Sequence, residues 1–316
     1  MKKKKKSQPA KMGRQKLRIK LRNDALLYFM LVPVLAWYII ICYIPMAGIT
    51  LAFREFRFDG GLWNSPWVGM ENFTKMLSDS DFLVAVKNTL IIGVGGIMFQ
   101  MPCAIILAIL VNEIKGAKAK KFFQTVVTFP HFISWVVLGG ILTSMFSSSG
   151  IINQMLGAFN LPSVSPLTNV ASFCPFIWIS NIWKEIGWDS IIYIAAITSI
   201  DTGLYEAAEV DGANRLQRMW HITLPGIRPT IVIMLILAVG QLMNNGRFDQ
   251  IFNLYSSPVY SVGDTLDTYI FRESFVTGGL NFGYSTAIGL FKSVIGVILI
   301  TASNKIATAM GETGLM

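Results

Sequence analysis

Cysteine and histidine are scarce in this sequence, and charge is scarce outside its amino-terminal end. The 316 residues include three cysteines and two histidines, too few histidines for a His-rich metal cluster. The cysteines lie in three different apolar stretches, without the Cys-x-x-Cys spacing of a metal or redox site, at Cys42, Cys103 and Cys174. No Gly-Lys dipeptide, Gly-x-Ser-x-Gly or His-Glu-x-x-His motif occurs, so the sequence holds no P-loop and no recognisable hydrolase motif.

Charged residues make up only 14% of the chain, whereas 53% is hydrophobic and the mean hydropathy is +0.53. This composition predicts an integral membrane protein. The net charge of +9 comes from residues 1–22, which hold eleven Lys and Arg and no acid; elsewhere 16 basic residues face 18 acidic ones. A basic tail can bind nucleic acid or anionic lipid, but directly before an apolar span it more often fixes orientation. We therefore expect residues 1–24 to form a cytoplasmic tail with no nucleic-acid partner.

Six apolar stretches are long enough for a bilayer, which needs ~20 apolar residues per helix. They cover approximately 26–53, 88–112, 122–146 with a kink at Pro130, 171–200, 229–246 and 285–307. Basic residues follow the second stretch at 115–121 and are absent from 147–170, which places both termini in the cytoplasm by the positive-inside rule. The sequence predicts an all-α integral membrane fold, with a first transmembrane helix and outside loop at 25–84 and a core at 85–310.

A polar interruption at 201–229 separates the fourth and fifth stretches. Asp201 or Thr202 can cap a first helix that ends at Val210. Glycine tolerates the left-handed conformation that ends a helix, so Gly212 predicts a turn. A second helix is expected from Ala213 to about His221, stopped by Pro225 and Pro229, with Pro229 in the first turn of the next helix.

Three short motifs in this interruption resemble the cytoplasmic coupling segment of ATP-binding-cassette importer permeases. They are Glu206-Ala207-Ala208, Asp211-Gly212-Ala213 and Leu224-Pro225. Two alanines leave a smooth surface that a partner can approach closely, and the glycine turn makes the hairpin compact. The alternative interpretation is an ordinary polar hairpin between membrane spans, which Glu-Ala-Ala alone would not exclude.

The fourth stretch carries polar and amphipathic residues at i, i+3, i+4, i+7 and i+8, which lie on one stripe of a helix. They are Asn181, Lys184, Glu185, Trp188 and Asp189. Charges at bilayer depth cost at least ~2.5 kcal/mol each on insertion scales, so they should face protein or water. The stripe predicts the lining of a pathway for a hydrophilic solute, with polar contacts between subunits as the alternative.

Smaller polar sets occur in three other stretches, and each could be structural instead. Gln241, Asn244 and Asn245 share a predicted face near the outer end of the fifth stretch, and His131 aligns with Ser134 and Trp135 in the third. Lys292 lies inside the sixth stretch, where the structural alternative is an ion pair with Glu185 or Asp189. Amides, hydroxyls and tryptophan are the groups that suit a sugar site.

Further segments are similar to carbohydrate importer permeases, above all to the polysaccharide and oligosaccharide branch, the LplB-like permeases. These segments are 43–46, 52–56, 67–73, 129–135, 248–254, 267–269 and 289–293. The resemblance implies a type I permease fold with a five-helix core plus one amino-terminal helix, six transmembrane helices in all. It also implies import of oligosaccharides or polysaccharides across the bacterial cytoplasmic membrane by alternating access.

The same resemblance implies the partners. They are a second homologous permease, an ATPase dimer that holds ATP and Mg, and an extracellular solute-binding protein, so this chain itself is not expected to be an enzyme or to bind a cofactor. One rival is an ATP-independent secondary transporter, in which the charged stripe would relay protons or ions. A second rival is an intramembrane enzyme built around His131, Glu185 and Asp189, for which the sequence offers no nucleophile–base pair.

Overall fold

The computed structural model describes residues 24–244, 247–276, 281–312 and 314, and it divides into two compact units, residues 1–50 and 51–316. Among the described residues, the secondary structure is helical apart from one isolated bridge between Arg54 and Trp67. The predicted all-α class is therefore confirmed. The predicted basic tail at 1–24 lies outside the described residues except for Asp24.

One continuous helix makes up the described part of the first unit and passes into the second. α2 (Ala25–Trp37) continues through a π-helical turn (Tyr38–Tyr43) into a 3-10 segment (Ile44–Phe53). The change of helical pitch falls beside Pro45, which has no N–H for an α-helical hydrogen bond. The whole segment, 29 residues from Ala25 to Phe53, is long and apolar enough to cross a membrane.

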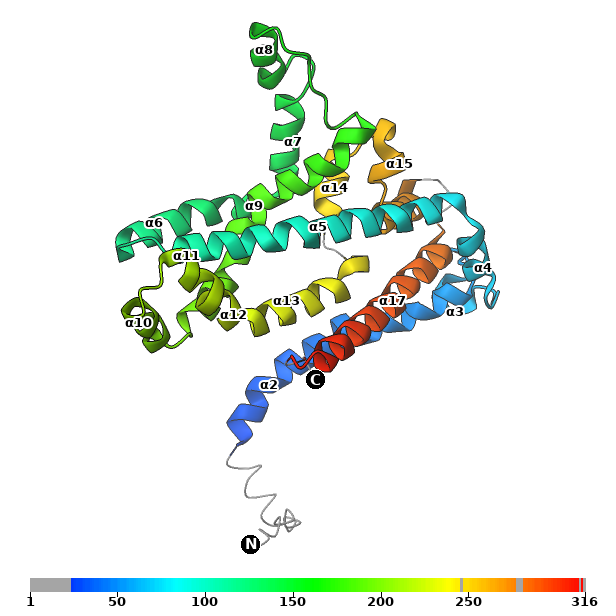
Figure 1. Ribbon diagram of the computed structural model, residues 1–316. Coiled ribbons are helices and arrows are strands. Elements are labelled where there is room, and N and C mark those ends of the chain that lie inside the picture. The colour runs from blue at the N-terminus through cyan, green and yellow to red at the C-terminus, as the bar shows by residue number, and fades with distance from the viewer. Residues whose placement is uncertain (1–23, 245–246, 277–280, 313, 315–316) are drawn as a thin grey trace, which may run out of the picture. The chain divides into compact units, whose positions relative to one another are not determined.

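Four helices form the frame of the second unit: α5 (Ser80–Asn112), α9 (Val170–Thr198), α13 (Arg228–Gly240) and α17 (Phe282–Ala309) (Figure 1). The shorter elements are α3 (Gly61–Asn64), α4 (Glu71–Ser78), α6 (Ala117–Thr128), η3 (Phe129–Phe132), α7 (Trp135–Met145), α8 (Ile151–Ala158), α10 (Thr202–Val210), α11 (Arg215–Arg218), η4 (Met219–Thr223), α12 (Leu224–Gly226), η5 (Leu242–Asn244), α14 (Phe248–Leu254), η6 (Ser257–Val259), α15 (Tyr260–Gly263), α16 (Leu266–Phe271) and η7 (Arg272–Val276).

α5 and α9 lie side by side and run in the same direction (Figure 1). Early in both helices, Trp178 Nε1 donates to the Ile92 carbonyl at 3.1 Å. Near their ends, Ala104 and Ile194 belong to one buried apolar cluster. The helices can approach this closely because residue 95 is glycine; a Cβ there would lie 2.3 Å from the Trp178 ring.

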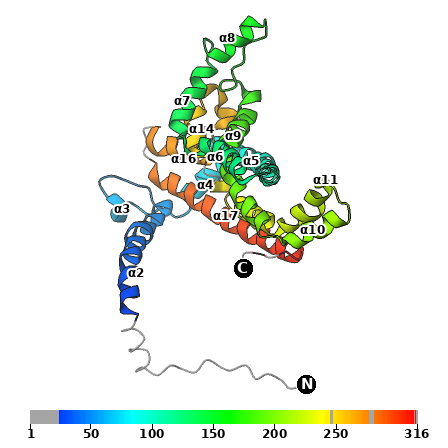
Figure 2. The same cartoon turned by 90° about the vertical axis from the view of Figure 1, so that its left-hand side faces the viewer.

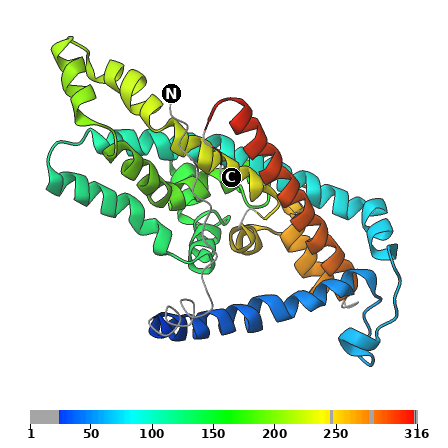
Figure 3. The same cartoon turned by 90° about the horizontal axis from the view of Figure 1, so that it is seen from below.

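α13 runs antiparallel to α17 and lies against it (Figures 1 and 3). The start of α13 meets the end of the chain, since Arg228 Nε lies 2.6 Å from Glu312 Oε1. The end of α13 meets the middle of α17, where a Cβ on Gly240 would lie 2.9 Å from Ile300.

The helix ends gather at two ends of the second unit. At one end, an apolar groove formed by the last part of α5 and the segment at 219–224 includes Leu110 and Trp220. At the other end, Asn88 Nδ2, in the first part of α5, donates to the Asp264 carbonyl at 3.0 Å. The basic loop at 115–121 and the hairpin at 201–226 therefore lie at the same end, as the sequence predicts.

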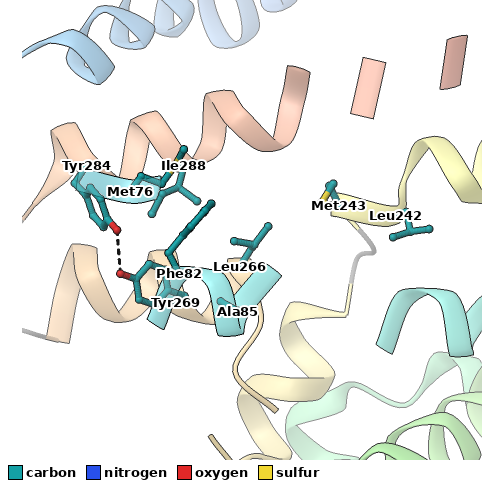
Figure 4. Packing of buried hydrophobic residues seen from close by; sticks show 9 residues of the cluster. All are labelled: Met76, Phe82, Ala85, Leu242, Met243, Leu266, Tyr269, Tyr284 and Ile288. Atoms are coloured by element: carbon teal, nitrogen blue, oxygen red, sulfur yellow. Dashed lines mark hydrogen bonds between the residues drawn. The ribbon is translucent and has the colours of Figure 1, made fainter. Parts of the chain in front are cut away.

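Asp79, directly before α5, links α16 and α17 at the end of the second unit that holds Asp264. Its Oδ2 accepts hydrogen bonds from Tyr269 Oη at 2.7 Å and Tyr284 Oη at 2.9 Å, and Figure 4 shows the two tyrosine hydroxyls facing each other among buried apolar side chains. Partial burial acts to raise the pKa of Asp79, but these hydrogen bonds outweigh it and hold the pKa below its usual value. The contact therefore stabilises the fold above the ordinary carboxyl pKa and is lost as the pH falls through the lowered one.

The count of six membrane spans is not established by the helices themselves. Among the described residues, three are long and apolar enough to cross a membrane: Ala25–Phe53, α5 and α17. Two bent pairs raise the number to five, Ala117–Phe132 with Trp135–Met145 and Arg215–Gly226 with Arg228–Gly240. α9 spans about 44 Å at the rise of an α-helix but carries three charged side chains, so composition alone does not identify it as a span.

The third and fifth stretches are shorter and more bent than predicted. Instead of a kink at Pro130, the helix ends at Phe132 and the chain turns by 90° into α7. Ser134 accounts for the new start, because its hydroxyl accepts the Val137 N–H at 3.3 Å as a helix cap. The fifth helix ends at Gly240 and not at 246.

Candidate coupling hairpin and solute pathway

The first half of the hairpin at 201–229 has the predicted local structure. α10 begins at Thr202, and the Asp201 carboxylate accepts the Gly203 N–H at 2.9 Å as its cap. After Val210 the chain turns at Gly212, where φ is +78°. The Ala213 N–H then returns to the Ala208 carbonyl at 2.9 Å, the closing bond of a helix that ends in a left-handed glycine.

The second half begins later and ends later than predicted. Asn214 caps α11 in a reciprocal capping box with Gln217, so the helix starts at Arg215 and not at Ala213. The prediction that Pro225 stops this helix is wrong, because the chain stays helical to Gly226. The π-helical turn at Met219–Thr223 absorbs the hydrogen bond that proline cannot make. The chain bends by 57° only after Gly226, and Pro229 lies in the first turn of α13, as predicted.

Side-chain contacts join the two halves of the hairpin while its tip stays exposed. Arg218 Nη1 lies 2.9 Å from Glu209 Oε2, and Tyr205 Oη lies 2.9 Å from Thr223 Oγ1. Val210, beside the turn, is 88% exposed. Figure 2 shows α10 and α11 projecting as a pair from the long helices of the second unit. Glu206, Ala207, Asp211 and Gly212 are exposed, whereas Ala208, Ala213 and Leu224 are half-buried and Pro225 is exposed. A compact hairpin whose halves are joined by side-chain contacts, with an exposed tip, suits docking into a groove of a partner.

Three polar side chains converge on Gln100, near the middle of α5. Its Oε1 accepts hydrogen bonds from Asn181 Nδ2 at 2.5 Å and from Arg247 Nη2 at 2.9 Å. Its Nε2 donates to Asp189 Oδ2 at 2.5 Å. Asn181 and Asp189 belong to the predicted stripe of α9, so Gln100 brings both ends of that stripe into one network. The amide also stands between a cation and a carboxylate.

A cavity of about 240 Å³ opens beside this network, between α5, α9 and α13. Its polar lining comes from Gln100, Asp189, Tyr193, Gln241 and Arg247, and the remaining wall is apolar or glycine. A concave site with few polar groups on a mostly apolar wall is typical of small-molecule binding. Gln241, predicted on the solute pathway, therefore lies on the cavity together with Asp189.

Lys184 and Glu185, in the middle of the stripe, contact the bent segment before α7. Lys184 is 5% exposed, and its Nζ donates to the His131 carbonyl at 2.8 Å and to Glu185 Oε1 at 2.6 Å. Glu185 Oε2 lies 2.5 Å from His131 Nδ1. Because the helix through η3 ends at Phe132, its last carbonyls lack helical partners, and Lys184 satisfies one of them. These three residues hold the end of a broken helix against α9.

Gly187 allows α6 to lie directly on α9. A Cβ at residue 187 would lie 2.0 Å from the Val127 carbonyl oxygen. Trp188 follows, and its ring stacks on the His131 ring with centroids 4.3 Å apart and an interplanar angle of 4°. The stacked Trp188 side chain is still 47% exposed, so it is accessible to a solute. That it contacts the solute stays a prediction.

The remaining predicted residues that the structure describes do not line this cavity. Lys292 is buried and pairs with Asp267 of α16, so the predicted pairing with Glu185 or Asp189 is wrong. The reason is geometric, since this part of α17 packs on α16. Asn244 is exposed in the η5 turn after the fifth helix, and Asn245 lies outside the described residues.

Two residues of the network, Gln100 and Arg247, are not among the predicted site residues. Gln100 is an amide inside an apolar stretch, so the argument applied to the α9 stripe could have identified it. Arg247 follows the fifth stretch at the position of an expected outside loop. Because α13 ends earlier than predicted, at Gly240, Arg247 lies at the cavity and not in an outside loop.

A polar cavity among mostly apolar helices, with an exposed hairpin at one end, is the arrangement expected of a membrane permease. Residues 100–311 match the family described as the binding-protein-dependent transport system inner membrane component. The chain belongs to this family. The family expected from the hairpin motifs is therefore confirmed. Members of this family are the membrane components of transport systems and not enzymes.

Known relatives cover nearly the whole chain. Protein LplB of Bacillus subtilis (strain 168) is 40% identical over 296 residues, which are 93% of this chain and 92% of the relative. The polygalacturonan/rhamnogalacturonan transport system permease protein YteP of the same organism is 38% identical over 303 residues, 96% of this chain and 94% of the relative.

A solved structure shares the fold. The crystal structure of a bacterial alginate ABC transporter, in complex with an alginate pentasaccharide-bound periplasmic protein, contains a chain 37% identical to this one with a TM-score of 0.84. The match covers 94% of this chain and 98% of the solved chain. The predicted permease fold is therefore confirmed.

Proposed function

We propose that this chain is the transmembrane permease subunit of an ATP-driven, binding-protein-dependent importer of oligosaccharides or polysaccharides. The observation that carries the proposal is the match, at a TM-score of 0.84 over 94% of the chain, to a chain of an alginate ABC transporter. The relative that transports polygalacturonan and rhamnogalacturonan, at 38% identity, supports the same substrate class. A cavity lined by amides, a carboxylate and a guanidinium over an apolar wall suits a polyhydroxylated solute.

The hairpin at 201–229 is the proposed contact with an ATPase subunit. Its exposed tip would sit in a cleft of that subunit, as a helix sits in a groove. α9 ends at Thr198 and Asp201 caps α10, so only a short connection separates the hairpin from the stripe of α9. Movement of the hairpin when two ATPases close on ATP and Mg would therefore reach the cavity through α9. Rigid-body rotation of the helices would then exchange the inward and outward openings.

The rest of the assembly follows from the same proposal. A second homologous permease would complete the solute pathway, and a solute-binding protein would deliver the sugar from outside. In this arrangement the chain crosses the bacterial cytoplasmic membrane six times, with the bent pair α6–α7 and the charged α9 counted as spans. The amino-terminal tail, the basic loop at 115–121, the hairpin and the carboxyl terminus would face the cytoplasm. The layout of a tail at 1–24, a first helix with its loop at 25–84 and a core at 85–310 belongs to this proposal.

The test is uptake by the complex purified from its native membrane and reconstituted in proteoliposomes. We expect an ATPase to co-purify with the chain, and we expect oligosaccharide uptake to require enclosed ATP and the solute-binding protein. A hydrolysis-deficient ATPase is the matched control, because it assembles without driving transport. Uptake that continues without ATP and follows an ion gradient would instead favour the secondary transporter.

A further inference from the structure

We infer that Arg247 and Asn181 form a subsite for the carboxylate of an acidic sugar, a uronate, and that the Gln100 amide fills this subsite when no sugar is bound. The inference rests on the proposed function, because it assigns a substrate class to the cavity between α5, α9 and α13.

Two donors from different elements converge on one acceptor oxygen. Arg247 Nη2 and Asn181 Nδ2 lie 2.9 and 2.5 Å from Gln100 Oε1. A guanidinium and an amide aimed at a single oxygen form the surroundings that a carboxylate oxygen prefers, and a hydrogen bond between charged groups is roughly twice as strong as a neutral one. A ligand carboxylate in the place of the Gln100 carbonyl would form a charge-assisted hydrogen bond with Arg247, which a neutral hydroxyl group does not provide.

Displacement of Gln100 also changes the other side of the network. Gln100 Nε2 is the hydrogen-bond donor to Asp189 Oδ2, so Asp189 needs a new donor once the amide moves. An ionised carboxylate accepts hydrogen bonds only, and sugar hydroxyls can donate to it. Asp189 and Arg247 both line the cavity. The matching ligand thus carries a carboxylate and hydroxyls on one sugar ring, as a uronate does, whereas a neutral sugar offers only the hydroxyls that suit Asp189.

Gly96 determines where the guanidinium lies. A Cβ at residue 96 would lie 2.1 Å from Arg247 Nη2 and 2.8 Å from its Cζ. Because the Arg247 side chain is flexible, Gly96→Ala should move the guanidinium without removing its charge. Gly289, in the membrane-length helix α17, offers a matched control, since a Cβ there has nothing within 4 Å.

The experiment compares two substrates with the same sugar chain, one with charged carboxylates and one with neutral methyl esters. The assembled importer, with its binding protein and ATPase, is reconstituted in proteoliposomes and supplied with trigalacturonate or with its methyl ester. Arg247→Gln should lower the ratio of acid to ester uptake by about tenfold or more, as expected when a hydrogen bond between charged groups is lost. Gly96→Ala should lower the ratio by a smaller factor, and Gly289→Ala should leave it unchanged. The binding protein is the same in every variant, so a changed ratio reports on this chain.

Three results separate the inference from its alternatives. Recovery of each variant in the assembled complex, and retained ester uptake, exclude misfolding as the cause of a lower ratio. If Arg247→Gln slows acid and ester equally, Arg247 has a structural role; if it changes neither, Arg247 does not take part in uptake. Either result shows that the subsite is wrong. Wild-type importer that takes up neutral oligosaccharides but not trigalacturonate overturns the subsite and leaves the proposed function standing. A lack of ATP-dependent uptake of any oligosaccharide counts against the proposed function itself.

Discussion

At the scale of single residues, the buried charges of α9 and α17 have partners within the same chain. Lys184 contacts Glu185 and the His131 carbonyl, and Lys292 pairs with Asp267. A buried ion pair contributes little net stability compared with apolar residues of the same size, because both charges lose their water. Removal of one partner is different, since it leaves the other charge buried and unpaired. Replacement of one partner should therefore destabilise the protein strongly, whereas replacement of both partners should cost much less.

We expect Lys184→Met to destabilise the complex strongly and Lys184→Met with Glu185→Gln to restore part of the loss. Breaking a buried pair from one side costs roughly 3–5 kcal/mol, and the contact of Glu185 with His131 places this case toward the lower value. The measurement is a double-mutant cycle on the thermal unfolding midpoint of the purified complex. Lys305→Met is the control, because Lys305 is exposed on α17 and should change the midpoint little. Costs that simply add would show that Lys184 and Glu185 act independently.

Residue types were easier to predict from the sequence than residue partners. A charge in an apolar stretch is visible in the sequence, which is why the α9 stripe could be predicted. Its partner can be far away in the chain: His131 and Lys184 are 53 positions apart. Periodicity assigns a residue to a helix face but does not say which helix packs on that face, so the Lys292 pairing was wrong and Gln100 was missed.

At the scale of helices and turns, local sequence rules work where a cap or a positive φ decides the structure. The Asp201 cap and the Gly212 turn were predicted because each depends on a few neighbouring residues. Breaks inside apolar stretches were predicted less well. The 90° turn after Phe132 depends on α9, where Lys184 satisfies the His131 carbonyl and Gly187 gives α6 room. No local pattern contains that information.

The hairpin turn gives a prediction at this scale: Gly212→Val should abolish transport and Gly212→Asn should largely preserve it. A Cβ at residue 212 meets nothing within 4 Å, so the cause is backbone strain at φ +78° and not a clash. A β-branched residue in this conformation costs roughly 1–3 kcal/mol, whereas asparagine tolerates it. The measurement is solute-stimulated ATP hydrolysis in proteoliposomes, with recovery of the chain in the membrane as a check on insertion.

The asparagine variant separates strain from chemistry at the turn. If both variants lose activity, the absence of a side chain at 212 matters and not the backbone conformation. If Gly212→Val keeps full solute-stimulated hydrolysis, the hairpin is not the coupling element, and another segment at the same end of the second unit must be sought.

At the scale of the whole molecule, the directions of the helices determine which loops lie at the same end of the second unit. α5, α9 and α17 start at the end that holds Asp79 and Asp264, and α13 runs the other way. The basic loop at 115–121 and the hairpin therefore share an end without any assumption about a membrane. The distribution of basic residues then predicts which end faces the cytoplasm, namely the end with the Lys and Arg residues.

The last prediction tests that orientation with single cysteines in a chain whose three native cysteines have been replaced. Ala117→Cys and Thr308→Cys, at the basic end, should react with a membrane-impermeant thiol reagent only after the membrane is opened, and so should Ser7→Cys in the tail. Ser148→Cys and Ser261→Cys should react in intact cells. The positive-inside rule supports this assignment through residues 115–121 and Lys305, against the absence of Lys and Arg from 147–170. In the proposed arrangement the parallel helices α5 and α9 both cross from outside to inside, which requires the bent α6–α7 segment to cross back between them. Labelling of Ala117→Cys together with Ser148→Cys in intact cells would mean that α6–α7 enters and leaves on one side. The six-span arrangement would then be wrong, although the helical fold would stand.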